Sequence, residues 1–308
     1  MTSSSSSSIP NIAFYRLSRE LRDFHQANHP NIFLHYQPDY LFHIKALLIG
    51  TENTPYENGF YLFTLDFDPK KYPFKPPTVE FKTIHDKVRF HPNFYSTGKV
   101  CLSILNTWSG PKWTSCQTLT TILLSLQSLL IEHPLHLEPF FETCNDIRNT
   151  TYTQMIEFEN INVTLLLYLQ KGCPSDHFTP FLEIMKKHFI EKYPSIVGKI
   201  NTCLDRYPMH QDHTTVVLSS IYRFHSEINY HHLLEKVHRV YEQLTSSPPL
   251  PTPDLPPPSS SAAPPKKISR EIPARSKNVG DEEFFNNEWY RICEDKIHRK
   301  YWKKIQKP

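Results

Sequence analysis

Residues 91–105 decide the fold and the chemistry, and they read His-Pro-Asn-Phe-Tyr-Ser-Thr-Gly-Lys-Val-Cys-Leu-Ser-Ile-Leu. A turn is predicted at Gly98, because glycine adopts the positive φ that such turns require. The chain is expected to become extended from Lys99, which places the Cys101 thiol just past the turn and near the surface. Asn93 precedes Cys101 by eight positions, and its carboxamide could donate to the oxyanion that develops when the thiol attacks a carbonyl group.

Further motifs on both sides of this stretch resemble the segments of ubiquitin-conjugating enzymes. Residues 54–59 read Thr-Pro-Tyr-Glu-x-Gly, residues 72–77 read Tyr-Pro-Phe-Lys-Pro-Pro, and Trp113 precedes a predicted helix. The resemblance covers about residues 10–145 and is closest to the Z-type branch, which the alternative ubiquitin-activating enzyme loads. A weaker similarity continues to about residue 195.

The resemblance implies a ubiquitin-conjugating enzyme. Such a protein accepts ubiquitin or a ubiquitin-like modifier from an activating enzyme as a thioester on Cys101, and transfers it to a substrate lysine, usually with a ubiquitin ligase. A second interpretation is a non-catalytic relative that serves as a binding or scaffold protein. The presence of Cys101 favours the enzyme, because such relatives normally lack the cysteine.

The same resemblance suggests roles for residues around the thiol. Asn93 would stabilise the oxyanion, hold the loop, or do both. Glu138 stands where the family places an acidic residue that orients or deprotonates the lysine, although Leu137 replaces the usual neighbouring acid or amide. His91 and Pro92 are interpreted as structural residues of the loop, since no acid is arranged to orient the histidine as a base.

Two docking surfaces also follow from the resemblance. In the family the first helix meets the activating enzyme with basic side chains, which indicates Arg16 and Arg19. Ligase binding is assigned to Phe74, Trp113 and Ser115. The family usually has Ser-Pro-Ala after the tryptophan, whereas residues 114–116 here are Thr-Ser-Cys, so the choice of ligase is open.

The hydrophobic periodicity predicts an α+β fold. An N-terminal helix precedes a four-stranded antiparallel meander sheet, an active-site loop, a covering helix and then a helical C-terminal extension. We expect helices at residues 11–28 and 117–131, and strands at 32–37, 40–48, 60–67 and 79–81. Thr114 or Ser115 would cap the second helix. The extension would contain helices at about 141–170, 178–192 and 212–244.

The family resemblance, the predicted helices and the changes in composition together divide the chain into five predicted segments. These are a disordered serine-rich N-terminus (1–10), a ubiquitin-conjugating core domain (11–150), a helical extension (151–245), a Pro/Ser-rich linker (246–280) and a C-terminal amphipathic helix (281–308). Nine of the 27 prolines lie between Pro248 and Pro265, which is typical of a stiff, extended linker. The linker could also dock on a polyproline-binding domain.

The overall composition limits the other possibilities. The 308 residues carry a net charge of only +3, which does not by itself indicate nucleic-acid binding. The six cysteines are scattered without metal-ligand spacing, so we expect no metal and no cofactor. The chain shows no secretory signal and no membrane-spanning run, so we expect a cytoplasmic or nuclear protein with no membrane partner.

Overall fold

The computed structural model describes residues 12–139, 141, 147–172, 176–208, 213–246, 282–285, 288–294 and 300–305. The chain divides into two compact units, Met1–Pro248 and Pro249–Pro308. The predicted serine-rich segment 1–10 lies outside the described residues, as does the linker 246–280 apart from Ser246.

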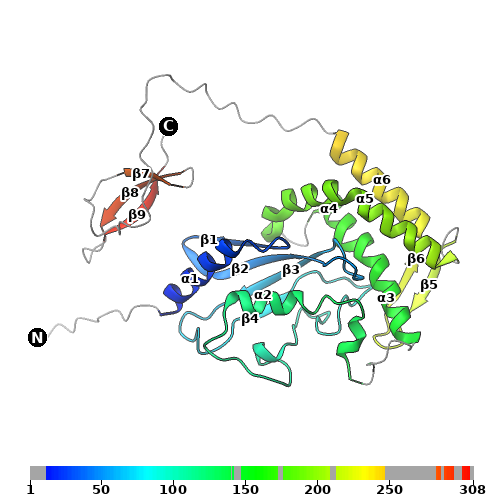
Figure 1. The fold of residues 1–308 in the computed structure, drawn as a ribbon, viewed down its shortest axis with the longest axis horizontal. Coiled ribbons are helices and arrows are strands. Elements are labelled where there is room, and N and C mark those ends of the chain that lie inside the picture. The colour runs from blue at the N-terminus through cyan, green and yellow to red at the C-terminus, as the bar shows by residue number, and fades with distance from the viewer. Residues whose placement is uncertain are drawn as a thin grey trace, which may run out of the picture. The chain divides into compact units, whose positions relative to one another are not determined.

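The first unit is built on a four-stranded antiparallel sheet that follows an N-terminal helix (Figure 1). The sheet has the order β1-β2-β3-β4, so each strand pairs with the next one along the chain. These elements are α1 (Ile12–Ala27), β1 (Ile32–Gln37), β2 (Tyr40–Ile49), β3 (Phe60–Asp66) and β4 (Thr78–Phe81). The predicted helix and meander are confirmed.

Both faces of the sheet are buried at its centre. In β3 every residue from Phe60 to Leu65 is buried. Tyr61, Phe63 and Leu65 belong to one apolar cluster with α1 and α2 (Leu119–Gln127), whereas Phe60 and Leu62 belong to a second cluster with the helical extension. A strand that is covered on both faces reads as a continuous apolar run, which accounts for its sequence.

The covering helix α2 begins later than predicted. Its N-cap is Thr118, whose hydroxyl accepts from the backbone N–H of Thr121, and the Thr121 side chain accepts in return from the backbone of Thr118. The prediction of Thr114 or Ser115 as the cap was wrong. This reciprocal pair satisfies two of the helix's unpaired donors, so the helix begins where both partners are threonines.

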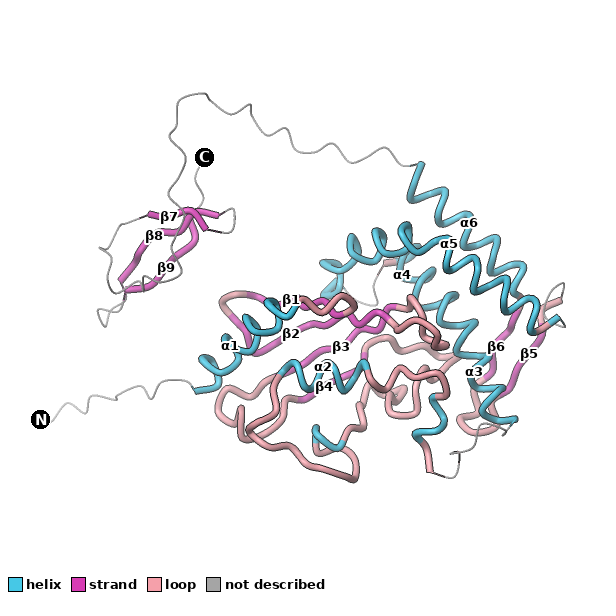
Figure 2. The backbone as a smooth tube through the Cα atoms, in the orientation of Figure 1, coloured by secondary structure: helices cyan, strands magenta, loops and turns pink. Residues whose placement is uncertain are grey.

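The extension is mostly helical, as predicted. Its elements are α3 (Ile147–Glu159), the π-helical segment η3 (Asn160–Leu167), α4 (Tyr168–Lys171), η4 (Asp176–Phe181), α5 (Leu182–Arg206) and α6 (Tyr230–Ser246). Figure 2 shows α5 and α6 running side by side. The predicted boundary between residues 150 and 151 falls inside α3, so core and extension form one continuous unit.

The expectation of helix from residue 212 was wrong. A β-hairpin, β5 (Thr215–Leu218) paired with β6 (His225–Ile228), precedes α6. The β-branched residues Thr215, Val216 and Val217 favour a strand. Arg223 takes a left-handed φ of 58° in the turn, which a helix cannot accommodate.

The second unit contradicts the predicted C-terminal helix at 281–308. Its described residues form a three-stranded antiparallel sheet of β7 (Glu282–Phe285), β8 (Glu288–Glu294) and β9 (Lys300–Ile305). The apolar spacing of three to five residues suggested a helix, yet most of those residues are aromatic or β-branched, and such residues favour strands. The register pairs Trp289 with Ile305 and Ile292 with Trp302.

Candidate active site

The active-site loop follows β4 and contains few regular elements (Figure 2). The backbone N–H of Phe81 donates to the carbonyl of Gly98 at 2.8 Å, which fixes the loop against the edge of β4. Gly98 has a φ of 87°, as the predicted turn requires. A Cβ at this position would also lie 3.1 Å from the Phe81 carbonyl oxygen, so the close approach depends on glycine.

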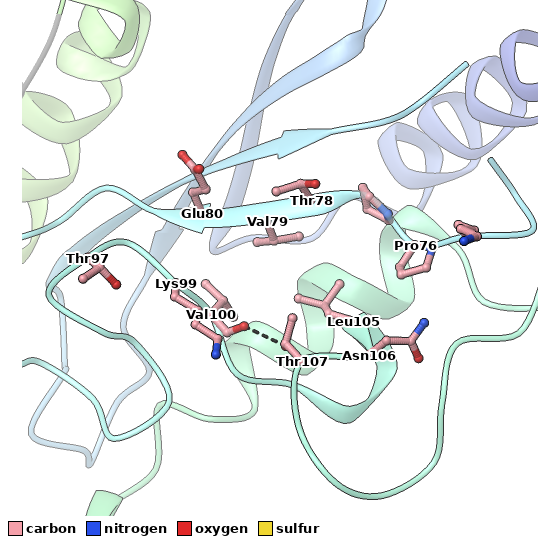
Figure 3. A pocket seen from close by; sticks show the side chains of 12 residues that line it. Pro76, Thr78, Val79, Glu80, Thr97, Lys99, Val100, Leu105, Asn106 and Thr107 are labelled. Atoms are coloured by element: carbon pink, nitrogen blue, oxygen red, sulfur yellow. Dashed lines mark hydrogen bonds between the residues drawn. The ribbon is translucent and has the colours of Figure 1, made fainter. Parts of the chain in front are cut away.

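Cys101 is buried, with only 2% of its surface exposed, so the expectation of a thiol near the surface was wrong. Its backbone N–H donates to the carbonyl of Asn93 at 2.9 Å. The hydroxyl of Thr107 accepts from the N–H of Leu102 at 2.9 Å and donates to the carbonyl of Val100 at 2.7 Å, the bond drawn in Figure 3. The backbone is therefore held on both sides of the thiol.

The side chain of Asn93 is directed at the cysteine residue itself. Its Nδ2 donates to the carbonyl oxygen of Cys101 at 2.8 Å. This contact ties the Asn93 side chain to the backbone at Cys101. A carboxamide nitrogen carries two hydrogens, and this bond uses one of them. The second hydrogen can therefore be donated to the carbonyl oxygen of an acyl group carried by the Cys101 sulfur.

His91 is fully buried, and both of its ring nitrogens have backbone hydrogen-bond partners. Its Nδ1 accepts from the N–H of Asn93 at 2.9 Å, and its Nε2 lies 2.9 Å from the carbonyl of Leu129. Because the first partner is a donor and the second an acceptor, the proton is on Nε2. Burial lowers the pKa of His91 to about 3, so the ring remains uncharged and connects the loop to the end of α2.

Glu138 follows the short helix η2 (Pro134–Leu137), where the resemblance placed an acid. Its Oε1 accepts a hydrogen bond of 3.0 Å from the hydroxyl of Tyr222, 84 positions away in the sequence. Tyr222 was missed in the sequence analysis, and no local pattern could have found it, because only the tertiary fold brings the hairpin turn to this loop.

The two predicted activating-enzyme contacts have different environments. Arg16 pairs with the buried carboxylate of Glu20 and donates to the carbonyls of Ser115 and Gln117 at 3.2 and 3.3 Å. It therefore connects α1 to the loop before α2. The Arg19 side chain is 75% exposed and lies 3.6 Å from Asp23.

The predicted ligase-binding residues also differ. The side chain of Phe74 is 72% exposed, as a docking residue requires. Trp113 is buried, and its indole N–H donates to the carbonyl of Pro73 at 2.7 Å. This bond holds the backbone next to Phe74. Ser115 is exposed, and its carbonyl accepts from Arg16.

A hollow of about 460 Å³ lies between β4 and residues 97–107 (Figure 3). Val79, Val100 and Leu105 form its apolar part, and Glu80 and Lys99 lie on its charged side. Within the described ranges, no group of three or more His, Cys, Asp or Glu side chains is placed to bind a metal ion. Among the described helices, none has both the length and the apolar character needed to cross a bilayer.

Comparisons with known proteins match part of the chain to one family. The model of the family "Ubiquitin-conjugating enzyme" matches residues 16–160. Ubiquitin-conjugating enzyme E2 Z of Xenopus tropicalis is 38% identical over 196 residues, covering 62% of this chain and 60% of that protein. Human ubiquitin-conjugating enzyme E2 Z is 39% identical over 182 residues, covering 58% and 50%. The structure of human ubiquitin-conjugating enzyme E2 G1 aligns with a TM-score of 0.34 and 26% identity, over 40% of this chain and 97% of that one.

Residues 16–160 are similar to the ubiquitin-conjugating enzyme family, and this part of the chain has the predicted α+β architecture. Within the family its similarity is to the Z branch. It spans 60% of the length of the Xenopus relative and 50% of the human one.

Proposed function

We propose that this protein conjugates ubiquitin or a ubiquitin-like modifier through a thioester on Cys101. The observation that carries the proposal is the bond from Asn93 Nδ2 to the carbonyl of Cys101, since it holds an amide donor beside the sulfur. The similarity of residues 16–160 to the ubiquitin-conjugating enzyme family supports the same chemistry. The partners implied are the modifier, a ubiquitin-activating enzyme, a ubiquitin ligase and lysine-bearing substrates.

The reaction would proceed in two acyl transfers. First, the Cys101 thiolate attacks the activated carboxyl carbon of the modifier on the activating enzyme; a C–S bond forms and the bond to the enzyme's leaving group breaks. Next, a lysine amine attacks the thioester; a C–N bond forms, the C–S bond breaks, and the amine proton passes to Glu138 or to water. Both steps place negative charge on the carbonyl oxygen, where one donor such as Asn93 typically contributes about 3–4 kcal/mol.

The burial of Cys101 favours a second candidate, a non-catalytic binding protein. The two are separated by mixing the full chain with ATP, ubiquitin and each of the two ubiquitin-activating enzymes. The proposal expects a band that thiol reagents remove. Cys101→Ser should convert it to a thiol-resistant ester or abolish it, whereas Cys116→Ser, a change at an exposed cysteine outside the loop, should leave it intact. Failure to load with either enzyme would leave the binding role.

We also propose that the protein acts in the cytoplasm or the nucleus, where a catalytic cysteine remains reduced. The described cysteines Cys101, Cys116 and Cys203 are all free, which suits that setting. Fluorescence imaging of the tagged chain tests this placement, and accumulation in the secretory pathway would contradict it.

A further inference from the structure

The turn of the β5–β6 hairpin lies against the active-site loop, although it belongs to the extension. The turn is ordered by backbone hydrogen bonds from Ser219 N–H to the carbonyl of Phe224 at 2.8 Å and from Arg223 N–H to the carbonyl of Ser219 at 3.0 Å. Ile221 and Tyr222 pack against the apolar cluster of the conjugating domain. An ordered turn can hold a side chain at a fixed position over a neighbouring loop.

Tyr222 contacts both Glu138 and Arg89. Its hydroxyl donates to Glu138 Oε1 at 3.0 Å, and its ring lies 4.3 Å from the guanidinium carbon of Arg89. The Arg89 guanidinium also lies 4.0 Å from the centre of the Tyr95 ring. Cation–π contacts of this kind attract the guanidinium to the ring faces.

Arg89 also donates hydrogen bonds to the backbone of the two residues that precede Asn93. Its Nε donates to the carbonyl of His91 at 3.3 Å, and its NH2 group donates to the carbonyl of Pro92. A second tyrosine of the extension, Tyr152, donates its hydroxyl to the carbonyl of Arg89 at 2.5 Å, and its ring lies 5.5 Å from that of Tyr222. Two tyrosines of the extension therefore fix the segment that carries Asn93.

The Tyr222 hydroxyl remains a donor under all ordinary conditions. Burial raises its pKa well above the usual value, and the nearby Glu138 carboxylate raises it further, because a phenolate there would be both poorly solvated and repelled. The protonated hydroxyl is the donor in the 3.0 Å bond to Glu138 Oε1. The carboxylate retains its second oxygen, Oε2, as an acceptor for an incoming amine.

We propose that Tyr222 is a positioning residue for transfer to lysine: its hydroxyl holds the Glu138 carboxylate for the acceptor amine, and its ring holds Arg89 against the loop before Asn93. The inference rests on the proposed function and deepens it, because it assigns part of the conjugating site to the extension. Loading of Cys101 does not involve an acceptor amine, so it should not depend on the Tyr222 hydroxyl.

The test uses the full chain and separates loading from discharge. Cys101 is charged with ubiquitin, the activating enzyme is then stopped, and discharge is followed with free lysine and, separately, with hydroxylamine. Hydroxylamine is uncharged at neutral pH and needs no carboxylate to hold or deprotonate it. Tyr222→Phe should slow discharge to lysine about three- to ten-fold, the value of one hydrogen bond. Loading and discharge to hydroxylamine should remain unchanged.

Two further variants make the result specific. In a Glu138→Ala background, Tyr222→Phe should have no additional effect, because the hydroxyl acts through that carboxylate. Glu138→Gln retains an oxygen for Tyr222 but loses the charge, and should also slow lysine discharge. Tyr193→Phe is the matched control, since it removes a hydroxyl that bonds to His238 between α5 and α6; its discharge should match the wild type.

Several results would overturn the inference. These are an unchanged or faster lysine discharge in Tyr222→Phe, an equal slowing with hydroxylamine, and the same fold-change in the Glu138→Ala background. Any of these, in a chain that loads normally, removes the role of Tyr222 and leaves the proposed function in place. A wild-type chain that never forms the thioester removes the proposed function, and the inference with it.

Discussion

The two faces of the four-stranded sheet are covered by different parts of the chain. One face packs against α1 and α2, whose apolar residues recur with helical periodicity. The other face packs Leu47, Ile49, Phe60 and Leu62 against the extension. The difference teaches that the extension is part of the fold, because without it four large apolar side chains of the sheet would face water.

The largest expected effect comes from removing the extension. A chain that ends at residue 146 would expose Leu47, Ile49, Phe60 and Leu62, at about 1.5–3 kcal/mol each. The total rivals the whole stability of a typical domain, so we expect no cooperative thermal transition in circular dichroism. A chain that ends at residue 248, the limit of the first compact unit, is the control and should melt like the full protein. Normal melting of the shorter chain would show that the second face tolerates water.

A smaller effect is expected at the contact between Gly59 and the extension. A Cβ on Gly59 would lie 1.8 Å from Asn160 Oδ1, which accepts from the Tyr61 hydroxyl at 2.5 Å. Gly59→Ala must displace that side chain and leave buried polar groups unpaired, at about 1–3 kcal/mol each. Denaturant unfolding should show this loss.

The matched control for that measurement is Gly198→Ala in α5, where no atom lies within 4 Å of the new Cβ. Alanine is the better helix former by about 1 kcal/mol, so this variant should be equal or more stable. A Gly59→Ala protein as stable as the wild type would mean that the extension is attached loosely to β3.

The third effect depends on pH and arises at His91, in the loop that precedes Cys101. Burial lowers the pKa of His91 to about 3, whereas the unfolded residue titrates near 6.5. Between these values the unfolded chain binds the extra proton, so stability is complete above about pH 6.5 and is lost as the pH falls. From pH 7.5 to 5.5 the loss should be about 1.4 kcal/mol from this group.

Melting temperatures across that range test the assignment. Burial also lowers the pKa values of His35 and His188, so the wild type should show a combined slope. His91→Gln should reduce the slope and leave the part due to the other two. If the melting temperature of His91→Gln depends on pH as steeply as that of the wild type, the pH dependence arises from other groups.

The smallest effect on stability is expected on the outer surface of α1. Arg19→Ala removes an exposed charge whose pair with Asp23 spans 3.6 Å, so the free energy of unfolding should change by no more than about 0.5 kcal/mol. Loading by the activating enzyme should nevertheless slow if Arg19 is a docking contact. Arg22→Ala, at another exposed arginine of α1, is the control and should load normally. Equal loading by the two variants would remove Arg19 from that surface.

Much of the conjugating domain could be predicted because its signals are local. Alternating apolar residues indicate the strands, and the turn before Cys101 requires a positive φ at Gly98 alone. The same local reasoning failed for residues 215–228 and 282–305, where apolar spacing fitted a helix and the aromatic and β-branched residues formed strands. It also misplaced the Cys101 thiol, because burial depends on what other segments cover it.

The order of the sheet strands, the α2 stripe and the Asn93–Cys101 pair follow from the sequence alone, since each rests on residues close together along the chain. The tertiary structure alone decided that Arg16 is occupied within the fold, that Trp113 is buried and that Tyr222 reaches Glu138. The physical reason is that hydrogen bonding and burial between distant segments depend on how the whole chain packs, and no spacing rule in the sequence encodes a partner 84 positions away.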